Sequence, residues 1–268
     1  MTRFIHLTDL HISHPDLNDP HLQSDTPETL RRVVGAINAM DPLPDFVVAS
    51  GDLTNHGDVQ SYELVRELMA PLKAPVVMAL GNHDQRAGFN EVFAPGLADA
   101  PYFHDAAQDD LHVITLDSSQ PGKVAGALDE AQFAFLDAAL ERHPDLQKLL
   151  VIHHPPRIDP EGLAWASLDQ QSSDRLAQAL AGRRMAGILS GHVHVNRGSL
   201  WHGVPLVIST GLHSSVDLLE PQDLRIVEGS GFALCDWRES GLTVSFVPLD
   251  PTASEIARLP REQLESFA

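Results

Sequence analysis

Several features are scarce in this chain of 268 residues. It has one cysteine, Cys235, so no internal disulfide can form. Its 18 Lys and Arg residues stand against 37 Asp and Glu, which gives a formal net charge of −19. Such a surplus repels phosphate backbones, for which a basic stripe is the usual footprint, so no long nucleic-acid partner is expected. Apolar runs reach about seven residues, far short of the ~20 that a membrane helix needs, so no membrane span is expected.

The start of the chain and its composition indicate its cellular location, its number of domains and the enzyme classes to which it does not belong. Met1 leads into an apolar β-type run and not into the apolar core of a signal peptide, and with the single cysteine this predicts a cytoplasmic location. A hydrophobic content of 43% suffices for a full core. We expect one domain over residues 1–250, followed by a polar tail at 251–268. The sequence has neither a Gly-x-Ser-x-Gly nor a P-loop pattern, which excludes the common serine hydrolases and P-loop enzymes.

Five short apolar runs, rich in β-branched residues, predict buried strands of an α/β fold. Each run ends in residues that can bind metal: 4–8 before Asp9 and His11, 46–49 before Asp52, 76–80 before Asn82, 149–152 before His153, and 186–190 before His192 and His194. In open α/β sheets, ligands bind outside the carboxyl ends of the strands, where loops can aim side chains at one point. The pattern therefore predicts a metal centre built from the whole chain.

Further elements follow from periodicity and capping residues. Helices are predicted from Thr26 to Asp41, after Asp58, after Asp129 with a capping box to Gln132, and over 173–181. Residues 85–110 are expected to be irregular with one short helix, and the loop over 155–172 to overhang the site. Strands over 231–237 and 242–247 predict an antiparallel hairpin. We expect the βαβ units of the first two-thirds to form one sheet and the later strands a second, more antiparallel one.

The candidate ligands point to two metal ions. In an extended chain residues i and i+2 point the same way, so Asp9 with His11, and His192 with His194, can each chelate one ion. Imidazole, carboxylate and amide groups without a thiolate indicate a first-row divalent metal, and zinc, ferrous iron and manganese all stay open. Seven candidates exceed the three protein ligands of a usual single catalytic site. Two ions about 3.5–4 Å apart form the clamp that in-line phosphoryl displacement uses.

In this order the motifs resemble those of the calcineurin-like metallophosphoesterases. Within that superfamily they are most similar to the bacterial class III cyclic-nucleotide phosphodiesterases and the related glycerophosphodiesterases. The motifs are Asp9-x-His11, Gly51-Asp52-x-x-Asn55, Gly81-Asn82-His83-Asp84, His153-His154-Pro155-Pro156 and Gly191-His192-x-His194, and the likeness covers roughly residues 2–250. The resemblance implies a four-layer α/β/β/α sandwich of two mixed sheets flanked by helices.

The resemblance also implies roles for these residues. The first metal would be held by Asp9, His11, Asp52 and His194, and the second by Asp52, Asn82, His153 and His192. Asp52 would bridge the two divalent ions, and a bridging hydroxide would attack phosphorus in line. His83, beside the ligand Asn82, would protonate the leaving alkoxide or stabilise the phosphorane oxygens. Purple acid phosphatases carry a tyrosine where this chain has Asn55, so a ferric-tyrosinate site is not expected.

Other residues near the motifs have weaker assignments. His56 and His154 adjoin site motifs and are candidates to fix ligand tautomers. His213 is a candidate to touch substrate. Arg157 either meets a phosphate or lies in an exposed loop, and Trp165 either stacks on a base or packs against its own loop.

The expected function is that of a dinuclear metal-dependent phosphodiesterase acting on small phosphodiesters, with 3′,5′-cyclic nucleotides such as cAMP favoured. A glycerophosphodiesterase or a broad-specificity diesterase is the alternative. A binding module on the same fold is the alternative without catalysis. The expected partner is a small-molecule phosphodiester, with no long nucleic acid and no membrane, and a homo-oligomer stays open.

Overall fold

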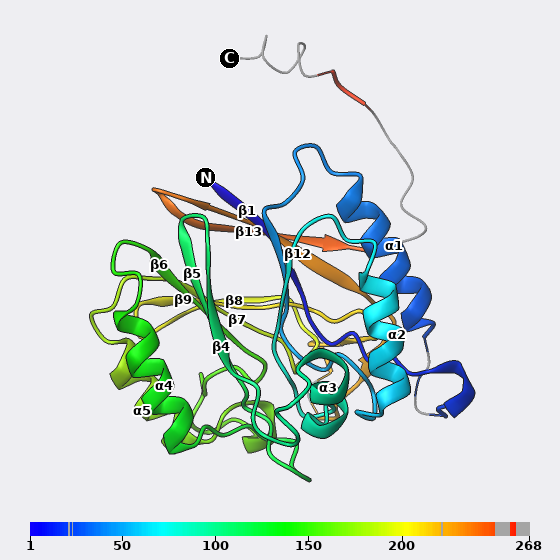
Figure 1. Cartoon of the computed structure of the whole chain (residues 1–268), viewed down its shortest axis with the longest axis horizontal. Coiled ribbons are helices and arrows are strands. Elements are labelled where there is room, and N and C mark those ends of the chain that lie inside the picture. The colour runs from blue at the N-terminus through cyan, green and yellow to red at the C-terminus, as the bar shows by residue number, and fades with distance from the viewer. Residues whose placement is uncertain (21, 23, 221, 250–257, 261–268) are drawn as a thin grey trace.

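Two β-sheets pack face to face, and helices cover their outer faces. The computed structural model describes all of residues 1–268 except 21, 23, 221, 250–257 and 261–268. Figure 1 shows α1 (Thr26–Asn38) and α2 (Val59–Met69) on one side of the strands, and α4 (Glu130–Glu141) and α5 (Gln170–Leu180) on the other. This is the α/β/β/α sandwich that the resemblance implied.

The first sheet has the strand order β13-β12-β1-β2-β3. Its parallel part consists of β1 (Thr2–Leu7), β2 (Phe46–Ala49) and β3 (Val76–Met78). The hairpin of β12 (Gly231–Arg238) and β13 (Gly241–Pro248) adds to it antiparallel, because β12 pairs with β1. The predicted hairpin near the end of the chain is therefore confirmed.

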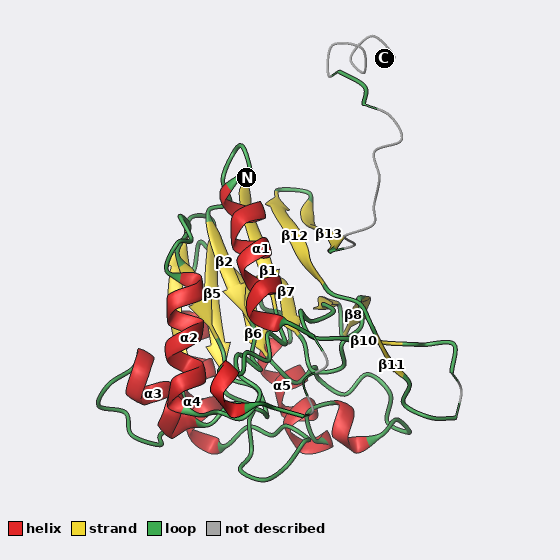
Figure 2. Ribbon diagram, turned by 90° about the vertical axis from the view of Figure 1, so that its right-hand side faces the viewer, coloured by secondary structure: helices red, strands yellow, loops and turns green. Residues whose placement is uncertain are grey.

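The second sheet has the order β4-β5-β6-β7-β9-β8. Four parallel strands form its middle: β5 (Leu111–Leu116), β6 (Gln147–Ile152), β7 (Met185–Ser190) and β9 (Val204–Ile208). The antiparallel strands β4 (His104–Gln108) and β8 (Arg197–Trp201) form its edges. A separate two-stranded ribbon, β10 (Ser215–Val216) with β11 (Ile226–Val227), lies apart from both sheets in Figure 2.

The predicted division of the strands between the sheets is wrong. The βαβ units of the first two-thirds do not share one sheet, since β1–β3 belong to the first and β5–β7 to the second. The late hairpin extends the first sheet instead of forming a second one. Residues 85–110 contain α3 (Arg86–Phe93), as expected, and also β4, which was expected to be irregular. The sequence of β4, His-Asp-Ala-Ala-Gln, has no β-branched residue, so its strand comes from pairing with β5.

Aspartates cap four of the helices. Asp58 accepts a hydrogen bond from the Ser61 N–H at the start of α2, as predicted. For α1, the cap is Asp25, one residue before the predicted Thr26. Asp129 caps α4 as predicted, and Asp169 caps α5, which begins three residues before the predicted start.

The predicted capping box at α4 is only half formed. The Gln132 N–H donates to Asp129, but the Gln132 side chain does not reach back to the cap. Instead it donates to the Asp117 carbonyl at 2.7 Å and accepts from the Asp117 N–H at 2.8 Å. Gln132 is buried, and it ties the start of α4 to the residue that follows β5. Short 3₁₀ turns at Pro15–Leu17 and Ala164–Ala166 complete the helical elements described.

The space between the sheets is filled by apolar side chains from both. Phe4 and Phe46 stack there at a ring-centroid distance of 4.9 Å, next to Leu149 and Val207 of the second sheet. Further apolar clusters lie beneath α1 and α2 and beneath α4 and α5. The three clusters hold the carboxyl ends of the parallel strands of both sheets in fixed positions.

The tail predicted at 251–268 lies mostly outside the described residues, and the single domain over 1–250 stays a prediction. Among the described residues, no helix is both long and apolar enough to cross a bilayer. The cytoplasmic location also stays a prediction.

The inter-sheet core gives a stability prediction. Phe46→Ala should lower the free energy of unfolding by about 3–5 kcal/mol, because it leaves a cavity where the Phe4 ring and the second sheet cannot close in. The control is Leu200→Ala on the edge strand β8, whose side chain is 73% exposed, and it should change that free energy by less than about 0.5 kcal/mol. Urea unfolding measures both. Equal losses in the two variants would contradict a tightly packed inter-sheet core.

Candidate metal centre

The seven sequence-predicted ligands all follow parallel strands, and they meet at one end of the sandwich. Asp9 and His11 follow β1, Asp52 follows β2 and Asn82 follows β3, all in the first sheet. His153 follows β6, and His192 and His194 follow β7, in the second sheet. The centre therefore lies across the carboxyl ends of both sheets, and neither sheet can form it alone.

The distances between their side chains place the two carboxylates among the histidines. The His194 Nε2 lies 3.2 Å from Asp9 Oδ1 and 3.3 Å from His11 Nε2. The Asp52 Oδ2 lies 3.2 Å from His153 Nε2 and 3.8 Å from His11 Nε2. Candidate ligand atoms of Asp9, Asp52 and His153 all lie within 4.8 Å of one another. Asp9 and Asp52 therefore both lie between the histidines of the two sheets, since Asp9 Oδ1 is also 3.9 Å from His153 Nε2 and 4.0 Å from His11 Nε2.

Hydrogen bonds on the far side of three histidines fix which nitrogen faces the centre. The His153 Nδ1 lies 3.1 Å from the Ser50 carbonyl, and the His192 Nε2 lies 2.7 Å from the Trp165 carbonyl. A carbonyl only accepts, so those nitrogens carry the protons and the lone pairs are on His153 Nε2 and His192 Nδ1. Such outer hydrogen bonds orient metal-binding histidines.

The His11 ring is fixed through an amide. The Asn55 Nδ2 donates to the Asp19 carboxylate, which turns the Asn55 Oδ1 toward His11 Nδ1 at 2.9 Å. His11 therefore donates from Nδ1 and offers Nε2 to the centre. Asn55 occupies the position of the tyrosine in purple acid phosphatases and supports the ring beside it.

Two buried polar atoms support a cation at this place. Among the described residues, Asn82 Oδ1 and His153 Nε2 have no hydrogen-bond partner, although Asp52 Oδ2 lies 3.2 Å from His153 Nε2. A buried acceptor without a partner is costly unless something else binds it. Both are electron-pair donors of the kinds that divalent first-row metals take. The residues present therefore fit a metal centre.

The charges of the buried groups favour the same conclusion. Burial alone would raise the pKa of Asp9, but His194 outweighs it and holds the pKa below its usual range. For Asp52, burial is likewise outweighed by His153, and the pKa is lowered. Burial lowers the pKa of His153, but the charges of Asp52 and Asp9 outweigh burial and raise the pKa to about 9, so that without a metal Nε2 carries a proton at neutral pH, which a bound cation would displace. Two ionised carboxylates in a buried position make the site attractive to positive charge.

The backbone at the centre is in an unusual conformation. Five of the candidate ligands have positive φ angles: Asp9 (50°), His11 (45°), Asp52 (49°), His192 (72°) and His194 (50°). A left-handed conformation is uncommon for residues with a Cβ, and such strain concentrates at functional sites. The strand ends are thus bent so that successive side chains turn toward one point.

Close approaches at two glycines make the packing possible. A Cβ on Gly191 would lie 1.9 Å from Thr8 Oγ1 and 2.4 Å from Asp9 Oδ2. A Cβ on Gly81 would lie 2.3 Å from Asp52 Oδ1. The loop after β7 therefore rests on the end of β1, and the loop after β3 rests on Asp52.

Asp84, the last residue of the Gly-Asn-His-Asp motif, is not aimed at the centre. Its carboxylate accepts hydrogen bonds from the N–H groups of Gly81, Leu53 and Thr54 at 2.9–3.2 Å and from the Tyr62 hydroxyl at 2.9 Å. Burial, with the nearby Asp52, raises the pKa of Asp84 to about 6. Asp84 thus joins the loops that carry Asp52 and Asn82.

Two further histidines stand over the centre. His83 is exposed, its N–H donates to Asp52 Oδ1 at 2.8 Å, and its Nδ1 lies 3.0 Å from the Asn55 carbonyl. The His213 ring lies 5.0 Å from the His11 ring and 6.1 Å from that of His194. Both line a cavity of about 390 Å³ that opens onto the centre, together with Asp52, Asn82 and His192.

The other residues singled out in the sequence have different surroundings. His154 is buried, with Nδ1 2.7 Å from Ser118 Oγ and Nε2 2.9 Å from the Val124 carbonyl, so neither nitrogen is available to a metal. His56 Nε2 lies 2.7 Å from the Asp19 carboxylate. Arg157 donates to the carbonyls of Pro160 and Gly162 and so holds its own loop. Trp165 lines the cavity, 5.8 Å from the His192 ring.

Sequence reasoning missed Asp19. Its side chain is 2% exposed and accepts from both Asn55 and His56. It belongs to the polar stretch after β1, where no local pattern separates it from its neighbours Asp16 and Asn18. Its role follows from the folded loop and not from any spacing.

Comparison with known proteins gives consistent findings. A family model described as calcineurin-like phosphoesterase matches residues 2–196. A protein of Rhodococcus erythropolis named as a probable cyclic nucleotide phosphodiesterase is 31% identical over 220 residues, which cover 80% of this chain and 72% of that protein. A probable glycerophosphodiester phosphodiesterase of Arcobacter nitrofigilis is 29% identical over 245 residues, with 85% of this chain and 89% of that protein covered.

The fold has solved counterparts. The crystal structure of a dimetal phosphatase from Danio rerio superposes with a TM-score of 0.67 at 14% identity, and the match covers 93% of this chain and 99% of that one. At this identity the likeness shows the shared fold.

The contact at Gly191 gives a prediction about the centre. Gly191→Ala should push the loop after β7 away from Thr8 and Asp9, and a shift of this kind should weaken manganese binding by about 10–100-fold. Titration calorimetry of the purified protein measures the affinity. The matched control is Gly198→Ala, where an added Cβ meets nothing within 4 Å. An unchanged affinity in the Gly191 variant would show that this loop does not set the position of the ligands.

Proposed function

Because this chain belongs to the calcineurin-like phosphoesterase family and is a metal-dependent phosphodiesterase, we propose that it hydrolyses small phosphodiesters at a dinuclear centre. Asp9, His11, Asp52 and His194 would hold one ion, and Asp52, Asn82, His153 and His192 the other. Divalent iron, manganese and zinc all suit this donor set.

One observation supports this proposal above the others. Asn82 Oδ1 and His153 Nε2 are buried without hydrogen-bond partners, while three histidines are oriented by outer acceptors so that their lone pairs turn inward. In a binding module without a metal, these buried acceptors without hydrogen-bond partners would only destabilise the fold, because they cost free energy unless a cation binds them. Two divalent ions held there supply charge stabilisation for a phosphoryl group under attack.

His83 is the proposed proton donor. With Nδ1 directed to the Asn55 carbonyl, Nε2 is the nitrogen that can exchange a proton at the cavity. In the protonated ring, Nε2–H would donate to the oxygen that leaves phosphorus, so the departing alkoxide takes up the proton. The bond from the His83 N–H to Asp52 fixes this residue beside the centre without making it a ligand.

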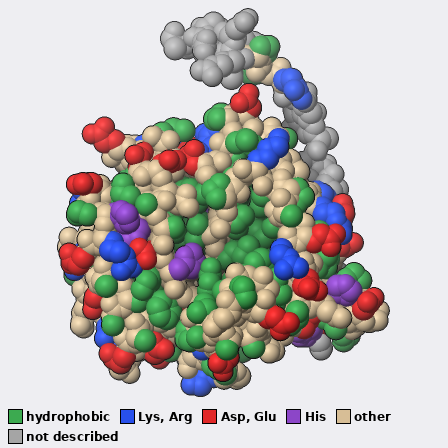
Figure 3. All heavy atoms as spheres, viewed as in Figure 1, with side chains coloured by type: hydrophobic (Ala, Val, Ile, Leu, Met, Phe, Trp, Pro, Cys, Tyr) green, Lys and Arg blue, Asp and Glu red, His purple; other side chains and the backbone are tan. Residues whose placement is uncertain are grey.

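The surface favours a small substrate. Figure 3 shows acidic side chains spread around the rim of one face of the molecule, in agreement with the net charge of −19. Such a surface repels a long polyanion, whereas a small diester can enter the cavity alone. The relatives' names support two small diesters, a cyclic nucleotide and a glycerophosphodiester. We favour a 3′,5′-cyclic nucleotide, with the glycerophosphodiester as the second candidate.

Two substitutions should separate metal binding from proton transfer. Asp52→Ala should abolish both metal binding and turnover, since Asp52 is the ligand that both ions would share in this proposal. His83→Ala should keep the metals and lower kcat by about 10²–10⁴-fold, the usual contribution of a general acid. Metal analysis and kinetics with bis(p-nitrophenyl) phosphate measure the two effects, with the exposed His202→Ala as a control. Fewer metals in the His83 variant than in wild type would contradict the assignment.

A panel of substrates tests the substrate class. With Mn²⁺ supplied, kcat/KM should fall in the order cAMP, glycerophosphoethanolamine, p-nitrophenyl phosphate. If the monoester is the best substrate, the diesterase proposal is wrong. A tenfold lead for the glycerophosphodiester would replace the cyclic nucleotide by the second candidate.

A further inference from the structure

The ribbon of β10 and β11 has one apolar and one polar face. Val216 pairs directly with Ile226, and the next backbone bond joins Asp217 to Arg225, so Val216 and Ile226 share a face. Leu224 lies two residues before Ile226 and shares that face as well. Asp217 and Arg225 lie on the opposite face, where their side chains form an ion pair at 2.7 Å.

The apolar face of the ribbon is turned toward the metal centre. Val216, Leu224 and Ile226 line the same cavity as His83, Asp52 and the other site residues. Leu224 is nevertheless 56% exposed and Ile226 is 63% exposed. Large apolar side chains that stay this accessible around a cavity mark a binding surface.

Other segments of the chain also contribute apolar side chains to the cavity. These are Val124, which is 53% exposed, Trp165 and Val193. The backbone carbonyl of Trp165 accepts the hydrogen bond from His192 Nε2. Val193 lies between His192 and His194 in the sequence. The cavity beside the metal centre is therefore lined by apolar groups from the ribbon and from these other segments of the chain.

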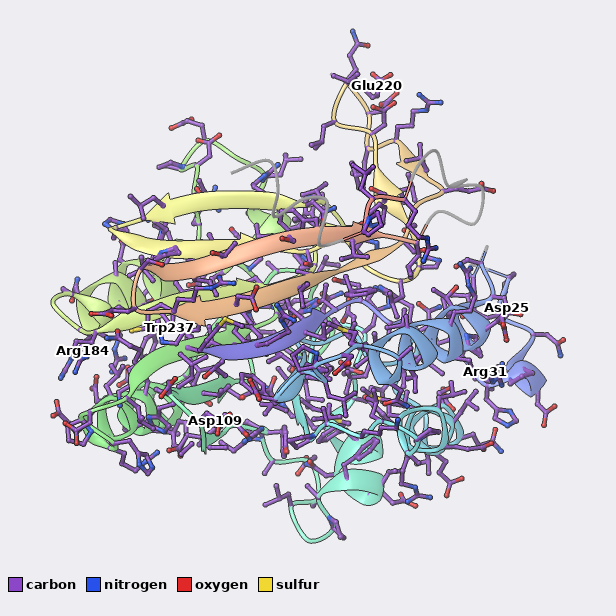
Figure 4. The ribbon with its side chains drawn as sticks, turned by 90° about the horizontal axis from the view of Figure 1, so that it is seen from above. Asp25, Arg31, Asp109, Arg184, Glu220 and Trp237 are labelled. Atoms are coloured by element: carbon purple, nitrogen blue, oxygen red, sulfur yellow. The ribbon has the colours of Figure 1, made fainter. Side chains whose placement is uncertain are left out.

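The ribbon is held in a fixed relation to the centre by its base. Ser214 Oγ lies 3.0 Å from His194 Nδ1, and the Ser215 hydroxyl donates to the His194 carbonyl at 3.3 Å. Figure 4 shows Glu220 at the tip of this projection, far from the body of the molecule. The base of the ribbon thus contacts a candidate metal ligand, while its apolar face lines the cavity.

On the basis of the proposed function, we infer that the apolar face of Val216, Leu224 and Ile226 forms, with Trp165, a subsite for the nucleobase of the substrate. A base presents a flat apolar surface that stacks on aromatic and aliphatic side chains whatever its edge groups. Carboxylates are common partners of a cationic head group such as ethanolamine. Among the described residues that line the cavity, Asp52 is the one carboxylate, and it belongs to the centre.

The subsite can be tested by comparing two ligands that differ only by the base. In the manganese-loaded protein, AMP should bind about 5–150-fold more tightly than ribose 5-phosphate, because stacking one base contributes that much. In the variant Leu224→Ser with Ile226→Ser, AMP should lose most of this advantage while the affinity for ribose 5-phosphate stays unchanged. Titration calorimetry gives all four constants. Both side chains are mostly exposed, so the substitutions should leave the melting temperature unchanged.

The matched control is Leu219→Ser, near the tip of the same ribbon, whose side chain is 91% exposed and does not line the cavity. This variant should keep the wild-type preference for AMP. Equal affinities for AMP and ribose 5-phosphate in wild type would overturn the nucleobase subsite and leave the proposed hydrolysis intact. If the manganese-loaded wild-type protein does not hydrolyse bis(p-nitrophenyl) phosphate, the proposed function fails, and the subsite fails with it.

Discussion

The carboxylate of Asp84 fixes the ends of two strands relative to each other, and the proposed metal centre depends on that relation. It accepts backbone N–H groups from the loop after β2 and from the loop after β3. Tyr62 on α2 donates to the same carboxylate, so the helix layer is tied in as well. Without Asp84, buried N–H groups in both loops would lose their acceptor, at a cost of about 1–3 kcal/mol each. Asp52 and Asn82, which these loops carry, would then no longer hold a defined separation.

The same region concentrates backbone strain. Five candidate ligands adopt left-handed φ angles, and each such residue costs of order 1–3 kcal/mol. The apolar packing between the sheets and beneath the helices has to offset this cost before any metal binds. Stability and function therefore oppose each other here, because a relaxed backbone would turn the side chains away from the common point. A cation that bound the acceptors without hydrogen-bond partners would stabilise the folded chain and offset part of this cost.

Much of this arrangement could be predicted from the sequence, because the information is local. An apolar run followed at once by Asp, Asn or His identifies a strand and its functional end together, so all seven candidate ligands were found without knowing how the strands pair. Pairing is not local. The assignment of β1–β3 and β5–β7 to one sheet was wrong, since the same βαβ pattern is compatible with one sheet or two. The strand β4 and the ribbon of β10 and β11 were missed because they are short and take their conformation from a partner strand. Asp19 was missed because only the folded loop brings its side chain next to Asn55.

The pairing of β12 with β1 has a consequence for synthesis on the ribosome. β1 is flanked by β2 and by β12. Because Thr2 lies opposite Trp237, β12 is synthesised long after β1 and β2. All seven candidate ligands, from Asp9 to His194, are made before it. If β1 pairs with β2 before β12 is made, β1 is an edge strand with unpaired N–H and carbonyl groups, and such edges pair with other chains. The nascent protein therefore holds every candidate ligand while its first sheet is still open to association with its neighbours.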